Sequence, residues 1–122
     1  MPGTPPHEMV QRDDGFTVVL ARDGDVVRVI LRGEFDLAGE ERWRQTLAEL
    51  GDDWSAILVD LSALELLDST GLRLIVGLHQ QCEAAERGFS VRLGHGAARR
   101  LFELSGLRHT FPEAPEEDDS SP

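Results

Sequence analysis

The residues from Ala56 to Leu78 constrain the fold of this chain more than any other stretch. They begin with a short, mainly apolar run from Ala56 to Leu61, the pattern of a strand buried on both faces of a parallel sheet. After a short connector, the spacing changes to the three- and four-residue steps of a helix, at Leu72, Ile75, Val76, His79 and Cys82. The stretch therefore predicts a strand, a tight connection and a helix.

Polar residues mark the start of this predicted helix. Asp68 and Ser69 are both good N-caps, so a hydroxyl should lie where the helix exposes unpaired amide donors. Such a position favours a phosphate group. The same residues also fit an ordinary α/β domain in which Asp68-Ser69-Thr70 only caps the helix.

A hairpin pattern precedes this stretch. Two strand-like segments, Phe16 to Ala21 and Val26 to Arg32, flank the turn signal Asp23-Gly24. In the second segment Val27, Val29 and Leu31 share one face, which we expect to be core, and the other face should be only half covered.

Helices and strands alternate along the rest of the chain. Asp36 can cap a helix from about Leu37 to Leu50, on which Trp43, Leu47 and Leu50 align. The later expected elements are a helix stop at Gly88, a strand from Phe89 to Leu93, a helix from Ala97 to Leu104 and a short strand from Arg108 to Phe111. Alternation requires crossover connections, so we predict an α/β fold with a mixed, mostly parallel sheet of four or five strands. Only the first hairpin strand should run antiparallel.

Length and charge limit the class of protein. With 122 residues, the chain can form one domain with a modest core. We expect that domain at residues 15–112, between a disordered N-terminal tail at 1–14 and a disordered acidic tail at 113–122. Of the formal net charge of −11, the N-terminal tail carries −2 and the C-terminal tail carries −5. The domain between them has no basic stripe. This argues against direct nucleic-acid binding.

The sequence shows no sign of a membrane or disulfide-bonded protein. It has no apolar run of about 18 residues and no signal-like start, so we expect a soluble, cytoplasmic protein. Its single cysteine, Cys82, cannot form an internal disulfide and is expected to pack in the core.

Three polar residues should meet at one edge of the sheet. Asp36, Ser69 and His95 each follow a predicted strand, and the carboxyl ends of parallel strands gather where α/β proteins place their sites. A small Ser/His hydrolase is one alternative, although Asp68-Ser69-Thr70-Gly71 lacks the glycine-flanked nucleophile turn. His79 would lie roughly 15 Å from Ser69 along a helix, too far to act on it. No histidines are spaced as metal ligands, and no cofactor is expected.

Three segments together resemble a known family. Leu58-Val59-Asp60-Leu61-Ser62 followed by Leu67-Asp68-Ser69-Thr70-Gly71-Leu72 is similar to the signature of the STAS domain of bacterial anti-anti-sigma factors. Gly33-Glu34-Phe35-Asp36 and the segment from Leu101 to Leu107 resemble two further family elements, in the right order. The resemblance covers about residues 16–111.

The resemblance implies a regulatory protein and not an enzyme. In the family, the unphosphorylated form binds an anti-sigma factor of the histidine-kinase-like ATPase type and so releases the sigma factor. That partner uses ATP to phosphorylate the serine after the aspartate, here Ser69, which cancels binding, and a phosphatase restores it. The alternatives within the family are a non-phosphorylated STAS scaffold or a lipid-transport subunit.

The same resemblance assigns roles to residues around Ser69. Asp68 would cap or orient the acceptor, Gly71 would let the partner's nucleotide site approach the backbone, and Asp36 matches the acid beside the acceptor. Thr70 is a second, less favoured acceptor. Leu74 and Leu78 lie off the main apolar stripe, so we expect them either to face the partner or to pack against the neighbouring helix.

Overall fold

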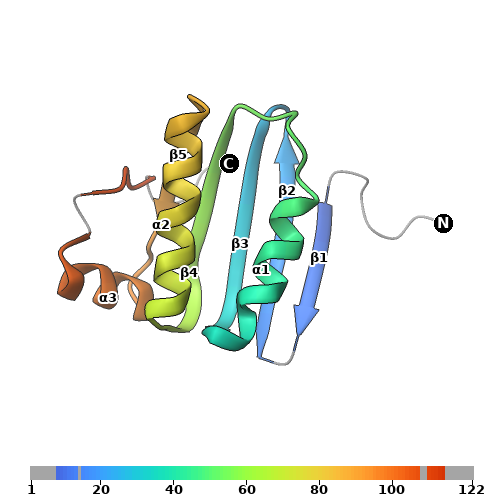
Figure 1. Cartoon of the computed structure of the whole chain (residues 1–122). Coiled ribbons are helices and arrows are strands. Elements are labelled where there is room, and N and C mark those ends of the chain that lie inside the picture. The colour runs from blue at the N-terminus through green and yellow to red at the C-terminus, as the bar shows by residue number, and fades with distance from the viewer. Residues whose placement is uncertain (1–7, 14, 108–109, 115–122) are drawn as a thin grey trace, which may run out of the picture.

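A computed structural model describes residues 8–13, 15–107 and 110–114 of the chain. Two helices, α1 and α2, lie side by side across one face of a five-stranded sheet, and α3 lies beside β4 (Figure 1). The elements in order are β1 (Glu8–Asp13), β2 (Phe16–Asp23), β3 (Val26–Phe35), the short 3-10 helix η1 (Leu37–Gly39), α1 (Glu40–Ala48), β4 (Ala56–Leu67), α2 (Ser69–Ala84), β5 (Gly88–Arg92) and α3 (Ala97–Ser105).

The strand directions confirm the predicted mixed sheet. The strands follow the order β1-β2-β3-β4-β5, in which β2 pairs antiparallel with both neighbours and the β3-β4 and β4-β5 pairs are parallel. Strand β2, the first strand of the predicted hairpin, is therefore the one that runs opposite to the other four. The carboxyl ends of β3 and β4 consequently lie at the same edge, where α1 and α2 begin (Figure 1).

Both predicted tail boundaries need correction. The expectation of a disordered tail at residues 1–14 is wrong for Glu8–Asp13, which forms strand β1 and pairs with β2 over its full length. At the other end, Glu113 forms a parallel bridge with Val91, and Ala114 is buried. The predicted strand from Arg108 to Phe111 is not found at positions 110 and 111, and positions 108 and 109 lie outside the described residues.

The core lies between the sheet and the helices. Val27, Val29 and Leu31 of β3 are fully buried, as their alternation predicts, whereas Arg28 and Ile30 on the opposite face are half-buried. Cys82 is buried in this core, and burial raises the pKa of its thiol, which keeps the thiol protonated.

Strand β4 is longer than the sequence suggests. The expected connector after Leu61 continues the strand to Leu67, with two register shifts against β3. The Asp60 carboxylate accepts hydrogen bonds from the amide and hydroxyl of Ser62, at 3.0 and 2.6 Å, and lies 3.5 Å from Arg92. These contacts hold the irregular segment in the sheet. The strand therefore ends immediately before Asp68, at the start of α2.

The helix boundaries differ from the prediction in two places. The segment after Asp36 starts as a 3-10 turn before α1, and α2 ends at Ala84, because Glu86 takes a left-handed conformation with φ of 59°. Gly88 is therefore the first residue of β5 and not the helix stop. Helix α3 ends at Gly106, which caps it in the left-handed conformation at φ of 78°.

Candidate functional site

Two acidic residues follow neighbouring parallel strands. Phe35 lies opposite Leu67 at the carboxyl ends of β3 and β4. Asp36 and Asp68 therefore leave the sheet side by side, and the Asp68 amide donates a hydrogen bond to the Phe35 carbonyl at 3.2 Å. The structure thus brings Asp36 to the same edge as the residue that directly precedes Ser69.

Asp68 is the N-cap of α2. Its backbone is extended, with φ of −100° and ψ of −176°, and its carboxylate accepts a hydrogen bond from the Gly71 amide at 3.0 Å. Its carbonyl accepts the first helical hydrogen bond, from the Leu72 amide at 3.0 Å. Of the two possible caps in the sequence, Asp68 takes the position, which leaves the Ser69 hydroxyl available for other chemistry.

Ser69 is the first residue of a 16-residue helix. It is exposed at the edge of the domain, whereas the neighbouring Thr70 is half-buried. The amides of the first helical turn and the aligned peptide dipoles give this end of α2 a partial positive charge. Ser69 therefore combines access with an environment that stabilises a phosphate, and Thr70 is the less accessible hydroxyl.

Asp36 is the N-cap of the short helix η1. Its carboxylate accepts a hydrogen bond from the Ala38 amide at 3.0 Å and so caps η1, which contacts α2. The acid is half-buried. It is fixed in place next to the start of α2, where its negative charge adds to that of Asp68.

Gly71 packs inward. A Cβ atom at this position would lie 2.8 Å from Leu67 Cδ1 and 3.0 Å from both Cγ and the carbonyl oxygen of Phe35. The family resemblance implies that Gly71 lets a partner's nucleotide site approach the backbone. The residue is buried, however, and its close neighbours belong to β3 and β4. Its role in the structure is to let α2 start directly against the sheet.

This packing predicts opposite effects for two glycines of the same helix. Gly71→Ala should reduce the free energy of unfolding by about 1–3 kcal/mol through overpacking. Gly77→Ala should raise it by up to about 1 kcal/mol, because a Cβ there has no neighbour within 4 Å and alanine favours the helix. Urea denaturation of both variants checks this, and a loss of stability in Gly77→Ala equal to that in Gly71→Ala would contradict the assigned packing.

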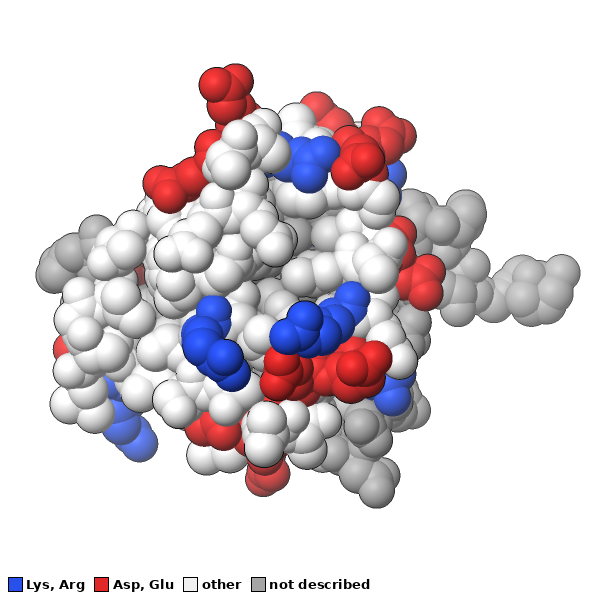
Figure 2. All heavy atoms as spheres, in the orientation of Figure 1, with Lys and Arg blue, Asp and Glu red and all other residues white. Residues whose placement is uncertain are grey.

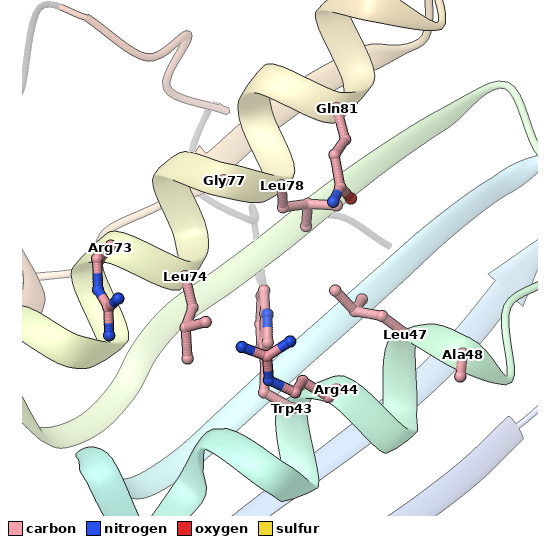
Figure 3. A pocket seen from close by; sticks show the side chains of 9 residues that line it. All are labelled: Trp43, Arg44, Leu47, Ala48, Arg73, Leu74, Gly77, Leu78 and Gln81. Atoms are coloured by element: carbon pink, nitrogen blue, oxygen red, sulfur yellow. The ribbon is translucent and has the colours of Figure 1, made fainter.

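Leu74 and Leu78 line a groove between α2 and α1. Leu78 is buried and Leu74 half-buried, so the expected packing toward the neighbouring helix describes Leu78 best. The groove has a volume of about 510 Å³, and Leu74 extends into it opposite Trp43 (Figure 3). Leu74 therefore retains the exposure that a partner contact needs.

The two histidines considered for chemistry lie in different surroundings. The His79 ring packs between Phe89 and Phe111, at centroid distances of 4.9 and 4.8 Å, and its Nε2 lies 3.8 Å from Glu83. His79 is therefore half-buried on α2. His95 is exposed in the turn before α3.

The described part of the chain holds neither a metal-binding cluster nor a membrane-spanning helix. Among its residues, no group of three or more His, Cys, Asp or Glu side chains is placed to hold a metal ion. None of its helices has the length and hydropathy needed to cross a bilayer.

The comparison with protein families identifies the fold. The model described as "Mlab, STAS domain" matches residues 18–113. This chain belongs to the STAS domain family. A curated relative of this STAS domain, the anti-sigma-F factor antagonist RsfB of Mycobacterium tuberculosis, is 30% identical over 99 residues, which cover 80% of each chain.

Solved structures agree with this assignment. An anti-sigma factor antagonist from Mycobacterium paratuberculosis shares 34% identity, with a TM-score of 0.75 over 88% of this STAS domain chain and 92% of that one. SpoIIAA at 24% identity shows the same fold in its unphosphorylated form and, from Bacillus, in its phosphorylated form, with TM-scores of 0.67 and 0.63. The two alignments cover 81% of this chain and 89% and 92% of SpoIIAA. The predicted resemblance to anti-sigma factor antagonists is confirmed.

Sequence reasoning missed several residues of the STAS domain that surround Ser69. Leu37 and Leu66 are 68% and 43% exposed, and they adjoin Asp36 and Leu67 along the chain. The sequence alone does not distinguish these two leucines from buried ones, because the exposure of a leucine depends on the fold. Arg73 was also missed. Its position four residues after Ser69 on a predicted helix indicates that the two side chains are neighbours on the helix surface.

Proposed function

We propose that this STAS domain protein is an anti-sigma factor antagonist, controlled by phosphorylation of Ser69. Its unphosphorylated form binds an anti-sigma factor in the cytoplasm and so releases the sigma factor. The partner is a serine kinase of the histidine-kinase-like ATPase type, and a phosphatase reverses the modification. The observation that carries this proposal is an exposed Ser69 hydroxyl at the start of α2, in a chain 30% identical to an anti-sigma-F factor antagonist.

The surroundings of Ser69 support a protein partner. Exposed Leu37 and Leu66 offer apolar contact area at the same edge of the sheet, and the hydroxyl itself is neutral. A contact of this kind depends on the absence of charge at its centre. Relatives that act as regulatory antagonists favour this function over the small Ser/His hydrolase.

Phosphorylation would change the binding surface without unfolding the domain. A phosphoserine adds about −1.5 to −2 charge, which the first turn of α2 can stabilise. The same charge lies near the carboxylates of Asp36 and Asp68 and must lose water when a partner covers it. Repulsion and desolvation both weaken binding, and each 1.4 kcal/mol of lost affinity is about a tenfold change.

Phosphate mapping tests the proposal. Each purified anti-sigma factor kinase of the source organism is incubated with this protein, magnesium and ATP, and the arginine-bounded fragment from Gln45 to Arg73 is sequenced by mass spectrometry. We expect one phosphate, on Ser69, which Ser69→Ala abolishes and Thr70→Ala retains. Phosphate on Thr70 in the unmodified sequence, or none with any kinase, would contradict the proposal. Absence of phosphate would favour a STAS scaffold or a lipid-transport subunit.

A further inference from the structure

A groove between α1 and α2 lies next to the proposed phosphorylation site. Its floor is apolar, with Trp43 and Leu47 on one helix and Leu74 and Leu78 on the other. The side chains of the two helices extend toward each other across the groove (Figure 3). Trp43 is 2% exposed and belongs to the core, whereas Leu47 and Leu74 are half-buried and accessible.

Two arginines line this groove, and one of them, Arg73, has no acidic partner among the described residues. Arg44 of α1 and Arg73 of α2 both line it, although the chain as a whole carries −11. On the face that carries α1 and α2, basic side chains lie near the centre, and acidic side chains lie directly beside some of them (Figure 2). Arg44 is hydrogen-bonded to Glu40 at 2.6 Å, which raises its pKa, and Arg73 forms no salt bridge with any described residue. Arg73 is thus free to pair with an incoming carboxylate.

Arg73 also lies within reach of Ser69. The two residues are four positions apart on α2, so both side chains project from the same side of the helix, one turn apart. Both are exposed. A phosphate on Ser69 would be a stronger and closer partner for the Arg73 guanidinium than a carboxylate supplied by a second protein.

We propose that the groove between α1 and α2 binds an acidic, amphipathic segment of the anti-sigma factor, and that phosphorylation of Ser69 withdraws Arg73 from it. The segment places apolar side chains on Leu47 and Leu74, and a carboxylate of the segment pairs with Arg73. Phosphoserine at position 69 then forms an ion pair with Arg73 within α2, so Arg73 no longer pairs with the segment. This inference rests on the proposed function and extends the contact surface from Ser69 along the groove.

Charge substitutions at the groove test the nature of the segment. Ala48 is exposed and lines the groove, so it tolerates long side chains. We expect Ala48→Glu to weaken binding of the purified anti-sigma factor about tenfold and Ala48→Lys to leave it unchanged or tighten it. Titration calorimetry gives both affinities. Equal affinities of the two variants and the parent would overturn the groove proposal while leaving phosphorylation control intact, whereas no binding by the parent would overturn the proposed function.

The coupling through Arg73 is testable without a partner. In protein carrying phosphoserine at position 69, phosphorus NMR follows the second pKa of the phosphate. We expect Arg73→Gln to raise this pKa by about 0.4 units, the shift that corresponds to an ion pair of about 0.5 kcal/mol. Arg87→Gln is the matched control, because Arg87 packs on Trp54 at the far end of α2. The same phosphate pKa in both variants would overturn the role of Arg73.

Discussion

Ser69→Asp should weaken binding of the anti-sigma factor at least a hundredfold, which corresponds to about 2.7 kcal/mol. The introduced carboxylate lies beside Asp36 and Asp68 at the start of α2, so a bound partner would bury three neighbouring acids. An acid in the first helical turn also interacts favourably with the helix dipole. The free energy of unfolding should therefore change by less than about 1 kcal/mol.

Ser69→Ala is the matched control for this variant. It cannot be phosphorylated and adds no charge, so it should bind with an affinity close to that of the unphosphorylated protein. Calorimetric titration of both variants, together with their urea denaturation curves, separates loss of binding from loss of stability. Equal affinity of Ser69→Asp and Ser69→Ala would rule out control by charge at this position.

Phe35→Ala should reduce the free energy of unfolding by about 3–5 kcal/mol and lower Tm by roughly 10 °C or more. The Phe35 ring is fully buried, stacks on Phe16 at 4.7 Å and packs against Trp43 at 5.3 Å. It also underlies Gly71, so the cavity would open directly beneath the start of α2.

Phe35→Leu serves as the control for this prediction. Leucine keeps most of the apolar volume, so we expect a loss of about 1.5 kcal/mol or less. Thermal denaturation followed by circular dichroism gives both values. Similar losses for the two variants would show that the ring is not the support of the site that its contacts indicate.

The sequence was sufficient for the central elements because their signals are local. The apolar run of β4 and the capping residue Asp68 lie within a few positions of each other, and helical spacing marks α2. The meeting of Asp36 with Ser69 at one edge follows from strand order alone, since both come after parallel strands. The structure confirms the positions of Asp36 and Ser69 at this edge, and their roles in the site stay predictions.

The missed features depend on contacts that are distant in sequence. Strand β1 reads Glu-Met-Val-Gln-Arg-Asp, which has little strand signal, and its structure comes from pairing with the edge of β2. The inward packing of Gly71 depends on how closely α2 approaches Phe35, and no local pattern reveals that distance. The groove likewise exists because α1 and α2 lie side by side on the sheet.

A phosphate on Ser69 should switch off partner binding in an otherwise unchanged fold. The most direct measurement compares one preparation of the protein before and after phosphorylation, with Kd for the purified anti-sigma factor and the amide NMR spectrum recorded in both states. We predict a Kd at least a hundredfold higher for the phosphorylated form, with amide shifts confined to the start of α2 and its neighbours. Equal Kd values for the two forms would exclude control of binding by phosphorylation of Ser69.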